Sequence, residues 1–246
     1  MFSPSRKRSA AILMLSAFSA TTVYPVAEAA TAAPDAGQAA PGTASQARAE
    51  ASTARHVVEA TGVVRRMAAE PRLRTLLRDA RGVFVVPQYG RAAIGLGASG
   101  GAGLLLVKTA SGAWSDPGFF NIGSVGIGLQ LGAQTGPLVF ILNNDKAVAE
   151  FKKKNNFALS ADAGLTVVNW TRLAQGTGGA GDIVVWSATR RLFGNAASVN
   201  VVDVRFNERA TAAYHGQSAN AEQVIEGKVG NAKADSLKEA LASAGI

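Results

Sequence analysis

The ten residues from Ile94 to Gly103 read IGLGASGGAG and contain a spacing that binds dinucleotides in other proteins. Gly95, Gly97 and Gly100 form G-x-G-x-x-G, in which the third glycine must open a helix whose N-terminus holds the pyrophosphate. Here Gly100 is followed by GAGLLLVKT, which is apolar without helical periodicity. The acidic residue expected about 20 positions later is also missing, since Asp116 precedes a proline in a turn. We therefore predict no nucleotide and no other cofactor.

The same stretch contains G-x-S-x-G around Ser99, the spacing of a serine hydrolase nucleophile. Asp162 or Asp182, followed by His215, would complete the chain order serine, aspartate, histidine. This motif also requires a strand, a sharp turn and a helix, and no helical pattern follows. We interpret His215 as a surface histidine and predict no enzyme and no catalytic residue, with a hydrolase using Ser99 and His215 as the remote alternative.

A strand explains both spacings without chemistry, because alternate residues of a strand share one face. The faces that this places together are nearly bare backbone. They comprise Gly95, Gly97, Ser99, Gly101 and Gly103 in the first segment, and Ser124, Gly126, Gly128, Gln130 and Gly132 in a second. Such faces predict a sheet surface on which another element packs closely, or a sheet that bends at its glycines.

Period-two and period-3.6 patterns locate the elements around these glycines. Helices are expected over 47–80, with a new helix starting at Pro71, and over 145–154, 221–226 and 235–244; strands are expected over 83–87, 93–109, 119–134, 138–142, 158–170, 182–187 and 198–206. Strand follows strand with few long helices between. This order predicts an α+β fold: a mainly antiparallel, glycine-rich sheet or partial barrel, flanked by several helices in a single domain.

The N-terminal region has the pattern of a secretory signal. Basic residues precede an apolar run, and Ala27-Glu28-Ala29 has the small-x-small spacing of a cleavage site. We predict a signal peptide over 1–29, a flexible linker over 30–46 and one domain over 47–246. The protein would then be periplasmic or secreted, with association with a membrane surface as a further option. The chain has no cysteine, which excludes disulfides and thiolate metal sites, and with no histidine cluster we predict no metal site.

Cleavage after Ala29 would leave 22 basic against 16 acidic residues, a balance that suits an anionic partner. Candidates for contacting an anionic headgroup are Lys152, Lys153 and Lys154, together with Arg65, Arg66, Arg72, Arg74 and Arg78. Both clusters also have plainer explanations. Lysines near a helix C-terminus are favoured by its dipole, and arginines on an amphipathic helix are usually its solvated face.

Several segments match a known domain family. They are ARGVFVVP over 80–87, Trp114-Ser115-x-Pro117, and Gly128-x-Gln130-x-Gly132, with further matches at Phe151, 159–163 and 213–216. With these segments the chain resembles the SYLF domain family over about 57–227. The tryptophan and glutamine motifs are read as structural, and Trp114 as a core residue near a turn.

The resemblance implies a lipid-binding module and a bacterial, secreted member. Eukaryotic members are similar proteins that bind phosphoinositide membranes and, in the yeast branch, actin filaments. The implied membrane element is an N-terminal amphipathic helix, here 49–67 with Arg65 and Arg66. We therefore predict a non-enzymatic protein that binds anionic lipid surfaces through basic residues and an inserted helix face. The alternative is a structural or assembly protein of the bacterial envelope that binds a protein or polyanion. No nucleic acid is expected, and the lipid and the oligomeric state are left open.

Overall fold

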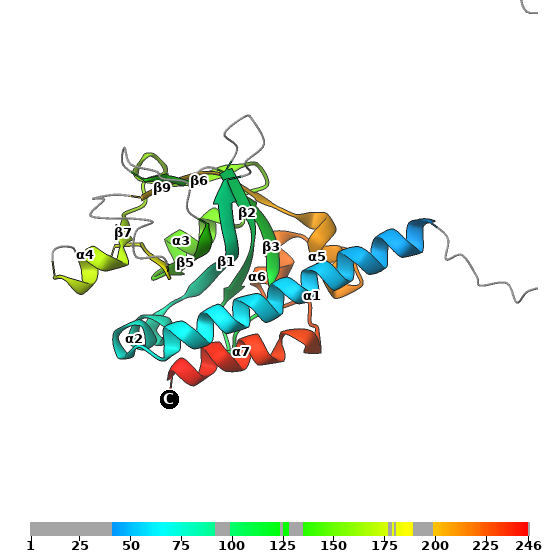
Figure 1. The fold of residues 1–246 in the computed structure, drawn as a ribbon, viewed down its shortest axis with the longest axis horizontal. Helices are drawn as coiled ribbons and strands as arrows, with labels where there is room; N and C mark the ends of the chain where they lie inside the picture. The colour runs from blue at the N-terminus through cyan, green and yellow to red at the C-terminus, as the bar shows by residue number, and fades with distance from the viewer. Residues whose placement is uncertain are drawn as a thin grey trace, which may run out of the picture. The chain divides into compact units, whose positions relative to one another are not determined.

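A computed structural model of the chain describes residues 41–91, 99–123, 125–127, 135–176, 179, 181–188 and 199–245. All of these residues belong to one compact unit, Ala39–Ile246 (Figure 1). The predicted signal peptide over 1–29 lies outside the described residues, as does the first part of the predicted linker. The domain boundaries therefore stay predictions.

The first helix, α1 (Pro41–Ala68), begins six residues before the expected start at Ala47. The linker predicted over 30–46 is therefore wrong for residues 41–46. Proline suits the first turn of a helix. The segment after it, GTASQ, mixes the good helix formers Ala44 and Gln46 with weaker ones and has no apolar stripe. The absence of an apolar period predicts a linker here, but an apolar period indicates which side of a helix is buried and not whether a helix forms. Helix α2 (Pro71–Asp79) starts at its proline as predicted.

The described strands form one nine-stranded sheet in the order β4-β9-β3-β2-β1-β5-β8-β7, with β6 pairing β9. Their bounds are β1 (Gly82–Arg91), β2 (Ser99–Val107), β3 (Gly118–Ile122), β4 (Val125–Ile127), β5 (Gly136–Leu142), β6 (Phe157–Leu159), β7 (Val167–Asn169), β8 (Ile183–Ser187) and β9 (Val199–Phe206). Of the pairings, β7 with β8 is parallel and the others are antiparallel. The predicted α+β class with a mainly antiparallel sheet is confirmed.

The shorter helices follow or connect the strands. They are α3 (Asp145–Glu150), α4 (Trp170–Ala174), α5 (Glu208–His215), α6 (Ala221–Ile225) and α7 (Asp235–Ala242), with 3-10 turns η1 (Ala161–Ala163), η2 (Ala232–Ala234) and η3 (Ser243–Gly245). The single strand expected over 158–170 is divided into two short strands, β6 and β7. The 3-10 turn η1 and Gly164, which adopts a left-handed conformation, interrupt it, and the Asn169 side chain caps α4. Helix α3 is capped by Asn144 and ends before the three lysines.

The sheet is buried on both faces. Along β1, Phe84 and Val86 belong to one apolar cluster and Val83 and Val85 to another, which explains the unbroken apolar run. Helix α1 crosses one face and lies beside α7, and it contacts both β1 and β2 (Figure 1). The centre of the sheet is thus a buried layer, and the charged side chains considered below lie on the helices and turns around it.

The glycines of β2 make room for side chains of the neighbouring strand. A Cβ atom on Gly103 would lie 2.4 Å from Cε2 of Phe84, and one on Gly101 would lie 2.7 Å from the Gln88 carbonyl oxygen. At Gly101 and Gly103 the bare face is therefore filled from β1. Gly95, Gly97, Gly128, Gln130 and Gly132 lie outside the described residues.

Candidate functional site

The α1–α2 corner carries four exposed arginines, Arg65, Arg66, Arg72 and Arg74, which we call the arginine surface. The Arg72 guanidinium donates to the Ala174 carbonyl at 2.9 Å, and Nε of Arg74 donates to the Ala68 carbonyl at 3.0 Å. None of the four forms an ion pair with another residue in the part of the chain that the structure describes. Their charges are therefore available to an external anion.

Helix electrostatics distinguishes two pairs within the arginine surface. Arg65 and Arg66 lie in the last turn of α1, where the helix dipole favours cations. Arg72 and Arg74 lie near the start of α2, whose first turn has no acidic residue and whose N-cap, Glu70, makes no side-chain capping bond. Cations at a helix N-terminus oppose the dipole. The position of this second pair is therefore not explained by the stability of α2.

The other predicted basic residues are mostly paired within the protein. Lys152 lies 3.8 Å from Glu226 and Lys153 lies 2.5 Å from Glu150. Lys154 is exposed in the segment after α3. The Arg78 guanidinium makes two hydrogen bonds to the Asp79 carboxylate, at 2.9 and 3.3 Å, and this lowers the pKa of the Asp79 carboxyl. The lysine cluster and Arg78 thus offer less uncompensated charge than the arginine surface.

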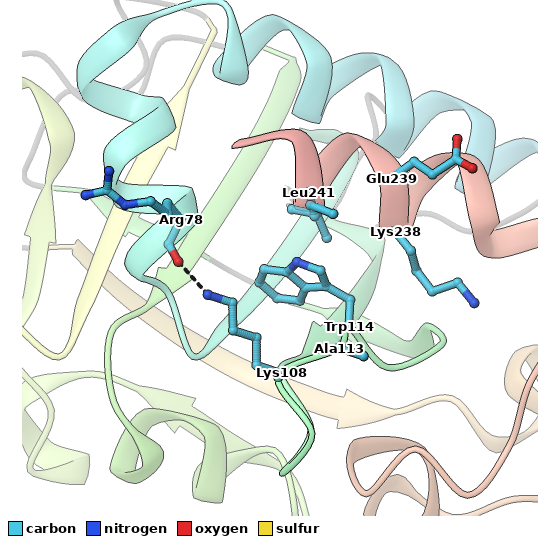
Figure 2. A pocket seen from close by; sticks show the side chains of 9 residues that line it. Arg78, Lys108, Ala113, Trp114, Lys238, Glu239 and Leu241 are labelled. Atoms are coloured by element: carbon cyan, nitrogen blue, oxygen red, sulfur yellow. Dashed lines mark hydrogen bonds between the residues drawn. The ribbon is translucent and has the colours of Figure 1, made fainter. Parts of the chain in front are cut away.

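An open pocket of about 560 Å³ lies beside the predicted Trp-Ser-x-Pro motif; we call it the Trp114 pocket. Figure 2 shows Lys108 and the Trp114 indole at its centre, with α7 above them and the end of α2 to one side. The residues that line it are Arg78, Lys108, Gly112, Ala113, Trp114, Lys238, Glu239, Leu241 and Ala242. Its walls are therefore contributed by α2, by the β2–β3 turn and by α7.

The motif residues lock the turn that carries this pocket. Ser115 Oγ accepts a hydrogen bond from the Val107 amide at 3.0 Å, and the Ser115 amide donates to the Val107 carbonyl at 2.8 Å. The Pro117 carbonyl lies 3.0 Å from Nε2 of His215. Trp114 is 9% exposed, so its indole is largely core and only its edge toward the pocket is open. Trp114, Ser115 and Pro117 are thus brought together and shape the turn.

Asp116 links this turn to α7. Its carboxylate accepts a hydrogen bond from the Asn231 amide at 3.0 Å and lies 3.3 Å from the Lys238 ammonium. Lys238 also pairs with Asp235 at 2.9 Å. These contacts hold α7 over the Trp114 pocket and neutralise Lys238.

Sequence reasoning missed Lys108, which lies just after β2. Its ammonium donates to the Arg78 carbonyl in the last turn of α2 and lies 5.3 Å from the centroid of the Trp114 ring. Burial lowers the pKa of Lys108, Asp79 raises it less, and Arg81 and Arg78 lower it further. The sequence feature that could have indicated Lys108 is its position at the end of an apolar strand, close to the tryptophan in the turn that follows.

The hydrolase alternative finds no support in the described geometry. Ser99 begins β2, so a strand and not a helix follows it. Nε2 of His215 is engaged by the Pro117 carbonyl, and its Nδ1 is buried without a partner. Asp182 accepts hydrogen bonds from the Thr166 amide and the Asn144 side chain. Asp162 lies in the turn η1.

The described residues contain neither a cluster suited to a metal ion nor a helix suited to cross a membrane. Within them, no group of three or more histidine, cysteine, aspartate or glutamate residues is placed to hold a metal ion. No helix in the same residues combines the length and the apolar character needed to cross a membrane.

Comparison with known proteins finds one matching family model and several relatives. Residues 123–244 match the family Ysc84, described as "Las17-binding protein actin regulator". The chain is 39% identical over 70 residues to bovine "SH3 domain-containing YSC84-like protein 1", covering 28% of this chain and 20% of that protein. It is 24% identical over 161 residues to "Protein YSC84" of Saccharomyces cerevisiae, covering 63% of this chain and 34% of that protein.

The chain thus spans about a fifth to a third of the length of these relatives. No solved structure matches it. The resemblance predicted from the sequence is shown at this level: residues 123–244 match the Ysc84 (SYLF) family model, and the chain is homologous to YSC84-like proteins. The bacterial, secreted character expected from the sequence stays a prediction.

Proposed function

We propose that the protein is a non-enzymatic module that associates with anionic membrane surfaces through the arginine surface. The observation that carries the proposal is a set of four exposed guanidinium groups that form no ion pair with any described residue. Two of them lie near the N-terminus of α2, where the helix dipole disfavours cations. Exposed basic residues each contribute about 1 kcal/mol near an anionic bilayer, so four supply about 4 kcal/mol. That corresponds to roughly several hundredfold in partitioning.

The proposed contact differs from the helix insertion expected from the sequence. The apolar face of α1 includes Val57, Val63, Val64 and Met67, each 2% exposed or less, and it packs against the sheet, α2 and α7. Insertion of that face would require α1 to leave the domain. We therefore propose that α1 stays in place and that binding is electrostatic, which makes it strongly dependent on salt.

Vesicle co-sedimentation tests this proposal. The full chain should sediment with vesicles containing phosphatidylserine or a phosphoinositide, not with pure phosphatidylcholine, and should be released at high salt. A variant with Arg65, Arg66, Arg72 and Arg74 changed to glutamine should lose this binding. The matched control changes Lys152, Lys153 and Lys154 to glutamine and should retain most of it. Equal losses in the two variants would contradict a role specific to the arginine surface.

A second candidate function follows from the description of the matched family, which names an actin regulator. The match covers residues 123–244 and so leaves out α1 and α2. If this part of the chain bound actin filaments, binding should survive the arginine substitutions. Co-sedimentation of the same variant with filaments separates the two functions. A protein partner in a bacterial envelope, the alternative expected from the sequence, would be captured from a delipidated envelope extract.

A further inference from the structure

We propose that the Trp114 pocket binds a single small amphipathic anion, with a carboxylate or phosphate head on Lys108 and an apolar body along Trp114 and Leu241. This ligand site is separate from the arginine surface and goes beyond the proposed function. The pocket volume of about 560 Å³ lies within the range of about 300–1,000 Å³ that small-molecule sites occupy.

The head group is assigned from the charges that line the pocket. Arg78 is neutralised by Asp79, and Lys238 by Asp116 and Asp235. Of the lining cations, Lys108 alone has no carboxylate within ion-pair distance among the described residues. It is half-buried, and one hydrogen bond to the Arg78 carbonyl leaves further N–H donors on its ammonium. An anion would supply the missing counter-charge.

The body of the ligand is assigned from the apolar wall. The Trp114 indole and the side chains of Leu241, Ala113 and Ala242 line the space next to Lys108. In Figure 2 the Glu239 carboxylate is turned away from the indole, so it does not place a negative charge over this wall. A wholly polar anion would leave the wall in water, and a cationic ligand would be repelled by Lys108. An amphipathic anion satisfies both parts of the pocket.

Isothermal titration calorimetry of the full chain tests the ligand class. The probes are octyl phosphate, octanoate, octyltrimethylammonium and inorganic phosphate, each below its micelle concentration. We expect saturable one-site binding of at least one of the two octyl anions, and which of them binds identifies the head group. Binding of the octyl cation equal to that of the anions, equal binding of inorganic phosphate, or no binding of either octyl anion would overturn the proposal.

Substitutions locate the site. Lys108→Gln should weaken binding by on the order of tenfold or more, because it removes a charge-assisted hydrogen bond, while Lys108→Arg should keep most of it. Lys108 also contacts the end of α2, so Lys108→Gln can affect folding. Ala242→Phe is therefore the second variant: Ala242 is exposed on the pocket wall, and the larger ring fills the space without touching Lys108's charge. Unchanged affinity in a folded Ala242→Phe variant would refute the location.

The result is separable from the membrane proposal. Replacing the four arginines should abolish vesicle binding and leave the titration with octyl anions unchanged. Ala242→Phe should do the opposite. If the arginine variant lost both activities while remaining folded, a distinct pocket site would be wrong.

Discussion

Replacing Gly103 with alanine should destabilise the protein much more than a glycine-to-alanine change does at a site where the added methyl group meets no neighbour. The added Cβ would lie 2.4 Å from Cε2 and 2.6 Å from Cζ of Phe84, and 2.9 Å from Cγ2 of Val86. The Phe84 ring cannot easily move away, because it packs between Phe140 at 5.7 Å and Phe151 at 5.2 Å between ring centroids. Either the ring or the β1–β2 pairing must shift.

Overpacking of a filled core costs typically about 1–3 kcal/mol, and the contacts under 3 Å place Gly103→Ala near the upper end of that range. For a domain of this size, about 3 kcal/mol lowers the melting temperature by roughly 6–12 °C. Gly62→Ala is the matched control. Gly62 lies inside α1, where a Cβ would meet nothing within 4 Å, so alanine should stabilise by up to about 1 kcal/mol.

Urea and thermal unfolding followed by circular dichroism measure both changes. A Gly103→Ala protein within about 0.5 kcal/mol of the wild type would refute the packing argument. A double-mutant cycle with Phe84→Leu tests the cause directly: the shorter side chain vacates the space, so the combined loss should be smaller than the sum of the single losses. Additive losses would mean that Gly103 is needed for another reason.

Three other predictions concern charge. Backbone and side-chain hydrogen bonds lower the pKa of the Asp182 carboxyl in the folded protein. The stabilisation that this carboxylate provides is therefore present above its ordinary pKa of about 4 and is lost as pH falls through the lower folded value. Asp182→Asn should lower the unfolding free energy at pH 7 by about 1–2 kcal/mol and by less at pH 2, as urea titrations at both pH values would show. Asp116→Ala removes the acceptor for the Asn231 amide and the partner of Lys238, and should raise hydrogen exchange in α7 more than in β1. Arg72→Gln combined with Arg74→Gln relieves an unfavourable dipole interaction of about 0.3–1 kcal/mol but removes the hydrogen bonds to the Ala174 and Ala68 carbonyls. The two effects oppose each other, so the unfolding free energy should change by less than about 1 kcal/mol while vesicle binding weakens; unchanged vesicle binding would contradict the electrostatic reasoning.

The parts of the fold that could be predicted are those that a local pattern determines. The apolar run at 83–86 predicted a strand, and β1 is buried on both faces. Pro71 predicted the start of α2. In each case a single residue type or a short period carries the information.

The helices that sequence reasoning missed depend on caps inside segments of mixed pattern. Asn169 caps the five-residue α4 directly after β7, and Asn207 caps α5 directly after β9. Such short helices carry too few turns for an apolar stripe to be recognised. The Trp114 pocket could not be predicted at all, because Lys108 and Lys238 are 130 positions apart in the sequence and meet only through the docking of α7.

The first helix shows why an amphipathic pattern does not by itself predict membrane insertion. A stripe of valine, alanine and methionine at three- and four-residue spacing is required equally by a helix that packs on a sheet and by one that enters a bilayer. In this protein the stripe is buried in the domain, so the apolar pattern of α1 is already explained by folding. Arg72 and Arg74 oppose the dipole of α2, and their hydrogen bonds to backbone carbonyls leave both charges without an ion pair among the described residues. Exposed arginines that oppose a helix dipole and have no ion pair among the described residues therefore indicate the binding surface better than the apolar stripe does.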